Sequence, residues 1–202
     1  MAVKTIIFDI GGVLVGYDWD AYMMQMFKDD RKLVDRIKNA LFGHGVWNEL
    51  DRGVWPKEKL IEAFCSYDPE ISNEIIYFFE NAGGALEIYP FTIEWLEELK
   101  ERGYQILFLS NWSSHVREAN QECLKFLPLM DGGVFSYEVK LIKPDHAIYE
   151  KIIEQYELNP SEAVFLDDSI GNVIAARECG LYGVHVKTHD QAVADLEEIL
   201  KL

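Results

Sequence analysis

The sequence predicts an α/β fold in which a parallel β-sheet carries helices on both faces and a group of helices is inserted after the first strand. Several short apolar runs lack polar alternation, which is typical of strands covered on both sides. Helical patterns separate most of these runs, and alternation of strand and helix favours a parallel sheet. The long stretch between the first two strands shows hardly any strand pattern, which indicates a helical insertion.

The strands of the sheet are the segments rich in Val, Ile, Leu and Phe. Four are predicted and a fifth is a candidate: 3–8, 105–109, 133–137 and 163–166, with 183–186 as the fifth. Together with the helices between them, they describe a Rossmann-like core.

The helices of the core follow from their apolar spacing and their stop signals. Residues 92–102 carry Ile93, Leu96 and Leu99 on one face and end at Gly103, a common residue just after a helix. The other predicted core helices are 114–126, 145–156, 170–179, which ends at Gly180, and 191–200.

The insertion is predicted to be a small helical domain. Its expected helices are 18–28, 31–42, 57–67 and 71–81, joined by glycine-bearing links. A crossover between parallel strands needs only about a dozen residues or slightly more, so an insertion of this length is surplus to the sheet and typical of a lid. We expect a core formed by residues 1–15 and 85–202 and a cap formed by residues 16–84.

Composition limits the partners of the chain. Its 202 residues include 19 basic and 35 acidic side chains, and the net charge of −16 opposes general nucleic-acid binding. An anionic substrate would need a local cation to approach. Three scattered cysteines and the absence of a membrane-length apolar run or a signal-peptide pattern favour a cytoplasmic protein. We expect no nucleic acid, no membrane, and a monomer or homodimer.

Polar side chains follow the predicted strands at the point where each strand ends. They are Asp9 after the first, Ser110 and Asn111 after the second, Lys143 in the loop after the third, and Asp167 with Asp168 after the fourth. The carboxyl ends of parallel strands lie along one edge of a sheet, where such folds bind ligands. We therefore expect these side chains to meet.

The expected cluster suits phosphate chemistry. Three crowded carboxylates need a positive partner, and an all-oxygen shell favours Mg²⁺. With Mg²⁺ and Lys143 present, a phosphate group becomes acceptable, and Asp9 is placed to attack phosphorus and form an aspartyl-phosphate. The glycines after Asp9 let backbone N–H groups of residues 10–12 approach the transferred group.

The motifs IIFDIGGVL, FLSN, KP and FLDDS, in this order, resemble the haloacid dehalogenase superfamily. The insertion is similar to its C1-type cap, and WNELDRGVWPKEKL is similar to cap segments of the subgroup with glucose-1-phosphatase and the N-terminal phosphatase domain of epoxide hydrolases. The resemblance implies the following roles: Asp9 as nucleophile and metal ligand, the Gly11 carbonyl as a second ligand, Asp168 and Asp167 at the metal, Ser110 and Asn111 with Gly11 and Gly12 at the phosphate, and Lys143 as a catalytic residue that steadies both the phosphate and Asp9.

One position departs from the pattern of that family. Most of its phosphatases carry a second aspartate two residues after the nucleophile, as general acid and base, and this chain has Gly11 there. Water, the substrate or another residue must then fill the role, with Asp18, Asp20 and His44 as candidates. Trp47 and Trp112 are candidates for lining the substrate pocket.

Three functions stay open at this level. The leading interpretation is a Mg²⁺-dependent phosphohydrolase acting on a small phosphorylated metabolite, such as a sugar phosphate. A metal-independent 2-haloacid dehalogenase also uses an aspartate nucleophile without the second aspartate, although Asp167 and Asp168 oppose this. A catalytically degenerate phosphate-binding protein is the third. Taken singly, Asp9 also suits a turn, and residues 110–111 and 167–168 suit helix caps.

Overall fold

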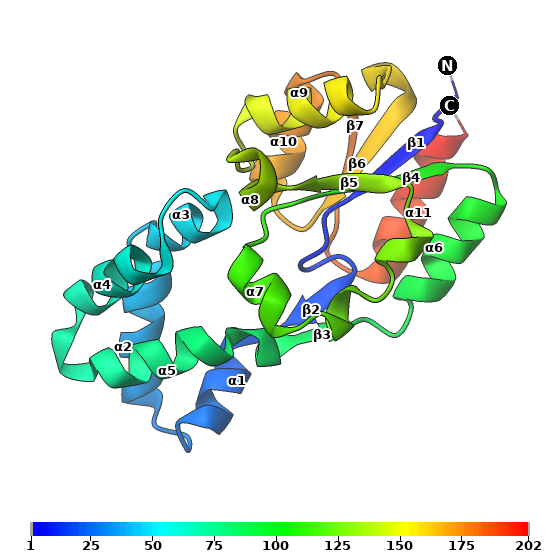
Figure 1. Ribbon diagram of the computed structural model, residues 1–202. Helices are drawn as coiled ribbons and strands as arrows, with labels where there is room; N and C mark the ends of the chain where they lie inside the picture. The colour runs from blue at the N-terminus through cyan, green and yellow to red at the C-terminus, as the bar shows by residue number, and fades with distance from the viewer. Residues whose placement is uncertain (1, 202) are drawn as a thin grey trace.

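The computed structural model describes residues 2–201 and confirms the α/β fold (Figure 1). Five parallel strands form one sheet in the order β5-β4-β1-β6-β7. Their bounds are β1 Thr5–Phe8, β4 Gln105–Ser110, β5 Gly132–Phe135, β6 Ala163–Asp167 and β7 Tyr182–His185. All five predicted strands are present, with small shifts at their ends.

The register of the sheet places the polar strand ends side by side. Phe8 of β1 pairs with Phe108 of β4 on one side and with Leu166 of β6 on the other. One residue further along, Asp9 therefore lies at the centre of the sheet's carboxyl edge. The neighbouring strands bring Ser110 and Asp167 to the same edge.

Helices cover both faces of the sheet because successive strand residues point to opposite sides. Ile6 and Phe8 pack in a cluster that contains residues of α6 (Thr92–Glu101) and α11 (His189–Leu200). Ile7 packs on the other face with residues of α9 (His146–Gln155) and α10 (Ile170–Glu178). The apolar, non-alternating strands reflect this double burial.

The insertion folds as a helical lobe beside the sheet (Figure 1). Its helices are α1 Trp19–Met26, α2 Arg31–Phe42, α3 Val46–Arg52, α4 Lys57–Tyr67 and α5 Ser72–Asn81, with short 3₁₀ turns at Pro69–Ile71 and Ala82–Ala85. They enclose a hydrophobic cluster of their own, between Met23 and Ala82. This separate cluster supports the proposed division into core and cap.

A two-stranded antiparallel ribbon joins the lobes. It pairs β2 (Val15–Tyr17) with β3 (Leu86–Ile88), at the two connections that the sequence indicates. Each strand has only three residues, too few for a recognisable apolar pattern, so the sequence did not reveal the ribbon. The buried Thr92 hydroxyl donates to the Leu14 carbonyl at 2.6 Å and fixes the start of α6 to the base of this ribbon.

Two sequence predictions were wrong in detail. The helix predicted over 114–126 ends early, as α7 (Ser114–Ala119), followed by 3₁₀ turns at Glu122–Leu124 and Leu127–Leu129. The Asn120 side chain donates to the carbonyls of Gly83 and Leu86, which turns the chain away from the helix. The strand predicted over 133–137 ends at Phe135, because α8 (Ser136–Val139) begins there.

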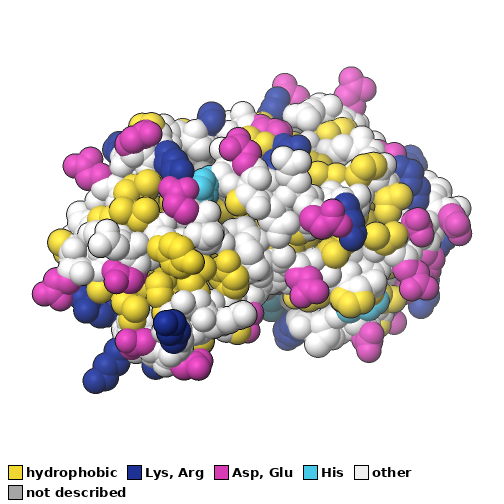
Figure 2. Space-filling view, turned by 60° about the horizontal axis from the view of Figure 1, so that its bottom comes forward, with side chains coloured by type: hydrophobic (Ala, Val, Ile, Leu, Met, Phe, Trp, Pro, Cys, Tyr) yellow, Lys and Arg dark blue, Asp and Glu magenta, His cyan; other side chains and the backbone are white. Residues whose placement is uncertain are grey.

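The exterior carries mixed charge. On the face shown in Figure 2, Lys and Arg side chains are dispersed among acidic ones. Within residues 2–201, no helix has both the length and the apolar character needed to cross a bilayer.

Candidate active site

Asp9 lies directly after β1 and is buried, with 8% of its surface exposed. Its Oδ1 accepts a hydrogen bond from the Ser110 hydroxyl at 2.6 Å and another from the backbone N–H of Ile10 at 2.7 Å. These donors come from the adjacent strand and from the turn, so the carboxylate is held in one orientation. An oriented carboxylate at the end of a strand suits a nucleophile.

Lys143 links two of the carboxylates. Its buried ammonium lies 2.9 Å from Asp9 Oδ2 and 2.6 Å from Asp167 Oδ2. Its backbone is fixed by Asn111, whose side-chain carbonyl accepts from the Lys143 N–H at 2.8 Å and whose amide donates to the Lys143 carbonyl at 3.0 Å. The lysine therefore reaches Asp9 from a loop whose backbone is held in place.

Asp167 is fully buried and has its oxygens occupied. Oδ1 accepts from the Ser169 N–H at 2.7 Å and from the Asn172 amide at 3.0 Å, and Oδ2 accepts from Lys143. Asp168, by contrast, is half-buried and lines the pocket beside Asp9. Among residues 2–201, no other side chain hydrogen-bonds to its carboxylate. Asp168 is thus free to take a ligand, whereas Asp167 is committed to holding Lys143.

The three carboxylates form a cluster with the dimensions of a cation site. One carboxylate oxygen from each of Asp9, Asp167 and Asp168 lies within 4.8 Å of the others, and those of Asp9 and Asp168 are the ones placed to ligate an ion, with Asp167 behind them. Oxygen donors at this spacing fit a hard divalent cation such as Mg²⁺, which takes one or two protein carboxylates and completes its shell with waters. The residues present therefore fit the metal that the sequence predicts.

The electrostatics of the cluster show its need for positive charge. Burial raises the pKa of Asp9 to about 7; Lys143 opposes this rise and Asp167 adds to it. The pKa of Asp168 is also raised, by burial and by the charge of Asp167. Burial alone lowers the pKa of Lys143, but Asp167 and Asp9 outweigh this effect and the pKa is raised overall. A single lysine thus offsets three acids, and the cluster favours a further cation.

The turn after Asp9 brings its backbone close to Asp168. Gly12 has a positive φ of 73°, and a Cβ atom there would lie 2.2 Å from Asp168 Oδ2. Its N–H donates to the Val15 carbonyl at 2.8 Å, and the Ile10 N–H is taken by Asp9. Of the three expected backbone donors, the N–H of Gly11 is the one without a protein partner among the residues described.

Replacing Gly12 with alanine is expected to weaken Mg²⁺ binding, because Asp168 must move to admit the new methyl group. The left-handed backbone adds a cost of about 1–2 kcal/mol. The measurement is a Mg²⁺ titration of the thermal unfolding temperature. Gly103→Ala is the matched control, since Gly103 also has a positive φ, of 89°, but open space around it. Equal Mg²⁺ affinity in the two variants would contradict this role of Gly12.

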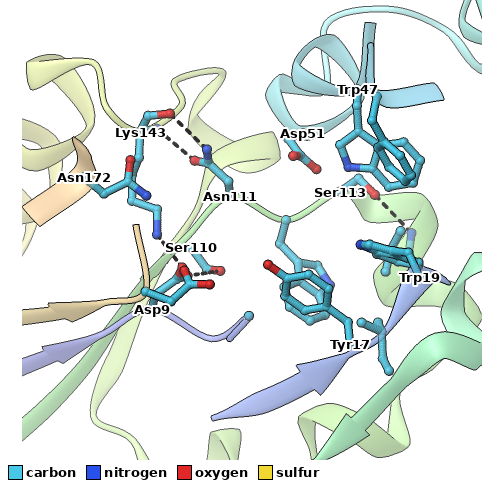
Figure 3. Close-up of a pocket in the computed structure, with 16 residues that line it drawn as sticks. Asp9, Tyr17, Trp19, Trp47, Asp51, Ser110, Asn111, Ser113, Lys143 and Asn172 are labelled. Atoms are coloured by element: carbon cyan, nitrogen blue, oxygen red, sulfur yellow. Dashed lines mark hydrogen bonds and ion pairs between the residues drawn. The ribbon is translucent and has the colours of Figure 1, made fainter. Parts of the chain in front are cut away.

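A pocket of about 300 Å³ opens above the carboxylates, between the core and the helical lobe (Figure 3). The predicted residues Asp9, Gly11, Ser110, Asn111, Lys143 and Asp168 line it, together with the candidates Trp47 and Trp112. Gly12 and Asp167 do not line it. The structure thus gathers the predicted side chains at one place, with Asp167 behind the others.

The sequence did not single out several residues that line this pocket. They are Tyr17, Trp19, Phe42, Asp51, Leu86, Ser113, Val116 and Asn172. Asp51 belongs to α3 and is the first residue of DRGVWP, which was expected to be a glycine-bearing link and not part of a helix. Gly45 and Gly53 bound a helix of only about two turns, and nothing in its sequence indicates which side faces the core.

The three groups suggested as substitutes for the missing second aspartate lie elsewhere. Asp18 caps α1 by accepting from the Ala21 N–H, and Asp20 is paired with Arg31 and Lys38. His44 is exposed and stacks on Tyr67. None of the three lines the pocket, so the structure gives no support to these candidates.

Comparison with known proteins agrees with this geometry. The family model of haloacid dehalogenase-like hydrolases matches residues 3–180. The chain is 25% identical over 201 residues to the sesquiterpene phosphatase astK of Aspergillus oryzae, covering 98% of this chain and 96% of that protein. It is 29% identical over 171 residues to the (S)-2-haloacid dehalogenase 4A of Burkholderia cepacia, covering 84% of this chain and 64% of that one.

Solved structures share the fold. A HAD family enzyme of Bacteroides thetaiotaomicron, crystallised with magnesium and inorganic phosphate, superposes with a TM-score of 0.72 at 21% identity, covering 93% of this chain and 96% of the other. With the match of the family model over most of the sequence, and with an acid, a hydroxyl, a lysine and an acidic pair meeting at the strand ends, the chain belongs to the haloacid dehalogenase-like hydrolase family.

Proposed function

We propose that this protein is a Mg²⁺-dependent phosphohydrolase that cleaves a small phosphomonoester through an aspartyl-phosphate at Asp9. The observation that carries the proposal is the cluster of three carboxylates within 4.8 Å, with the buried Lys143 ammonium 2.9 Å from Asp9. The relationship to a named phosphatase and the fold shared with an enzyme crystallised with magnesium and phosphate support it.

In this proposal each side chain of the cluster has a separate role in the reaction. Asp9 attacks phosphorus, and Lys143 with Ser110 holds its carboxylate in position. The Gly11 N–H would donate to the transferred group, while the Ser110 hydroxyl goes on donating to Asp9, and Asn111 keeps the Lys143 loop in place. Asp9, the Gly11 carbonyl and Asp168 would hold Mg²⁺, with Asp167 behind them; when bound, the ion would neutralise charge on the carboxylates and the phosphate.

The walls of the pocket favour an apolar alcohol as the leaving group. Away from the carboxylates, the lining is mostly aromatic and aliphatic: Trp19, Phe42, Trp47, Leu86, Trp112 and Val116. Among residues 2–201 the buried indole N–H of Trp112 has no hydrogen-bond partner, and we assign it to one oxygen of the substrate. A sugar phosphate would leave most of its hydroxyls facing apolar side chains without hydrogen bonds, which is costly.

Removal of metal is expected to abolish phosphate release, since the carboxylates then repel the dianionic substrate. Protein treated with EDTA is assayed on a panel of aryl, alkyl and sugar phosphates, before and after Mg²⁺ is restored. Activity should return with Mg²⁺ and should be highest on the apolar esters. Asp168→Asn should raise the Mg²⁺ concentration needed for half-maximal activity, while Asp190→Asn, at a fully exposed position, should not.

The same assay separates the alternatives. Chloride release from 2-chloropropionate without metal would favour a dehalogenase, a function suggested by the similarity to the Burkholderia enzyme and by Gly11. Absence of turnover on every ester, with Mg²⁺ and phosphate still bound, would indicate a degenerate phosphate-binding protein. Highest activity on sugar phosphates would refute the proposed preference for an apolar leaving group, but not the proposed phosphohydrolase activity.

A further inference from the structure

The chain lacks a side chain where a proton donor for the leaving alcohol would be expected. Gly11 occupies that position, and the space beside it is filled: a Cβ atom on Gly11 would lie 3.3 Å from the Tyr17 ring and 4.0 Å from Trp112. An alkoxide is a poor leaving group at neutral pH, so cleavage of an alkyl phosphate calls for a positioned acid. The acid must come from another wall of the pocket.

Elimination among the titratable residues of the pocket leaves one side chain. Asp9 is the proposed nucleophile, Asp168 a proposed metal ligand, and Lys143 is engaged by two carboxylates. Burial raises the pKa of Tyr17 to about 12, helped by the charge of Asp168, so its phenolate is too scarce at neutral pH to act as the base that activates water. Asp51 is the remaining ionisable side chain that lines the pocket.

Asp51 faces the pocket from the side opposite Asp9. It lies near the end of α3, and Figure 3 shows its carboxylate entering from the helical lobe, across the cavity from the strand ends. In phosphoryl transfer the attacking and leaving oxygens lie roughly in line on opposite sides of phosphorus. A phosphate attacked by Asp9 therefore directs its leaving oxygen towards the lobe that carries Asp51.

The end of α3 is fastened to the core, which fixes the position of Asp51. The Ser136 hydroxyl donates to the backbone carbonyl of Asp51 at 2.6 Å. The Ser136 hydroxyl oxygen also accepts from the Trp112 N–H at 2.9 Å. The Lys140 ammonium donates to the Gly53 carbonyl at 2.7 Å. Ser136, at the start of α8, and Lys140, just after its end, thus hold α3 against the loop that follows Ser110.

We propose that Asp51 is the general acid and base of the reaction, in place of the residue missing at Gly11. The inference rests on the proposed phosphohydrolase function. In the first step the Asp9 oxygen bonds to phosphorus, the bond from phosphorus to the alcohol oxygen breaks, and the protonated Asp51 carboxyl gives that oxygen its proton. In the second step Asp51 takes a proton from water, the water oxygen bonds to phosphorus, and the bond to Asp9 breaks.

The surroundings of Asp51 suit this role. Burial raises its pKa to about 7, the charge of Asp9 adds to the rise, and Lys143 opposes it. An acid with a pKa near the working pH is available in both protonation states. In this proposal the helical lobe contributes a catalytic group as well as part of the pocket wall.

The test compares Asp51→Asn with the wild type on two esters that differ in leaving group, 2-phenylethyl phosphate and p-nitrophenyl phosphate. Nitrophenolate departs without a proton, whereas the alkoxide needs one. For the variant, kcat/KM on the alkyl ester should fall about 10²-fold or more, and kcat/KM on the nitrophenyl ester should change little. Release of nitrophenol should show a burst, because breakdown of the aspartyl-phosphate has lost its base.

The possible results distinguish failure of the role proposed for Asp51 from failure of the proposed phosphohydrolase activity. No hydrolysis by the wild type of either ester or of any ester in the panel described above would refute the phosphohydrolase itself. Equal losses on both esters, no loss on either, or a wild type that cleaves only the nitrophenyl ester would refute the role of Asp51. Asp51→Glu should retain part of the activity on the alkyl ester. Glu49→Gln changes a carboxylate on the same helix outside the pocket, and it should behave as wild type.

Discussion

Replacing Asp9 with asparagine is expected to lower phosphate release by on the order of 10⁴-fold or more, the scale of loss when a covalent nucleophile is removed. Asparagine has nearly the same shape and can still accept from the Ser110 hydroxyl, but its amide cannot form the bond to phosphorus. The measurement is phosphate release from an aryl phosphate at saturating Mg²⁺, at protein concentrations high enough to detect residual turnover.

The control for Asp9→Asn is Asp190→Asn, which removes a fully exposed carboxylate and should leave turnover unchanged. Binding of inorganic phosphate with Mg²⁺ is measured in parallel by calorimetry. Retained binding with lost turnover is the expected combination. Turnover within about tenfold of wild type would exclude Asp9 as the nucleophile, since positioning alone could then account for the rate.

Replacing Lys143 with methionine is expected to destabilise the protein by about 3–5 kcal/mol, the range seen when one partner of a buried ion pair is removed. Methionine fills similar space, but Asp9 and Asp167 lose the ammonium that lies 2.9 Å and 2.6 Å from their oxygens. For a chain of this length, the loss corresponds to a fall in unfolding temperature of roughly 6–20 °C. Activity should fall as well, because Asp9 loses the group that orients it.

The effect of Lys143→Met should depend on pH. Lys143 lowers the pKa of Asp9, so its removal raises that pKa further in the folded state. A carboxyl whose pKa is higher when folded binds more protons folded than unfolded, and stability then falls as pH rises. The gap in unfolding temperature between wild type and variant should therefore narrow at acidic pH. Lys125→Met, at an exposed lysine, is the control; a gap that does not change with pH would contradict the buried pairing.

The sequence predicted those site residues that lie at the carboxyl ends of the strands. An apolar strand followed at once by Asp9, Ser110 or Asp167 fixes where each side chain lies, because parallel strands end along one edge. The grouping of these side chains followed from their positions at the ends of the predicted parallel strands. The individual roles did not: the sequence cannot show that Asn111 bonds the Lys143 backbone, or that Asp167 is enclosed while Asp168 is open.

The sequence did not predict those site residues whose positions depend on packing between the core and the helical lobe. Asp51 lies on a helix of two turns between Gly45 and Gly53, and its approach to the site depends on the contacts of α3 with Ser136 and Lys140. Such contacts join residues far apart in the sequence and leave no periodic pattern. Trp19, Phe42 and Trp47, which line the pocket, likewise come from three helices of the helical lobe, and the apolar pattern of each helix fits the lobe's own core equally well.

The central claim is that a divalent cation allows the acidic strand ends to accept a phosphoryl group on Asp9. The most direct measurement is a crystal structure with Mg²⁺ and beryllium trifluoride, which mimics a phosphoryl group on a carboxylate. We expect beryllium bonded to an oxygen of Asp9 and Mg²⁺ bound by Asp9, the Gly11 carbonyl and Asp168. Beryllium trifluoride on any other residue, or a cation bound away from these three, would contradict the account.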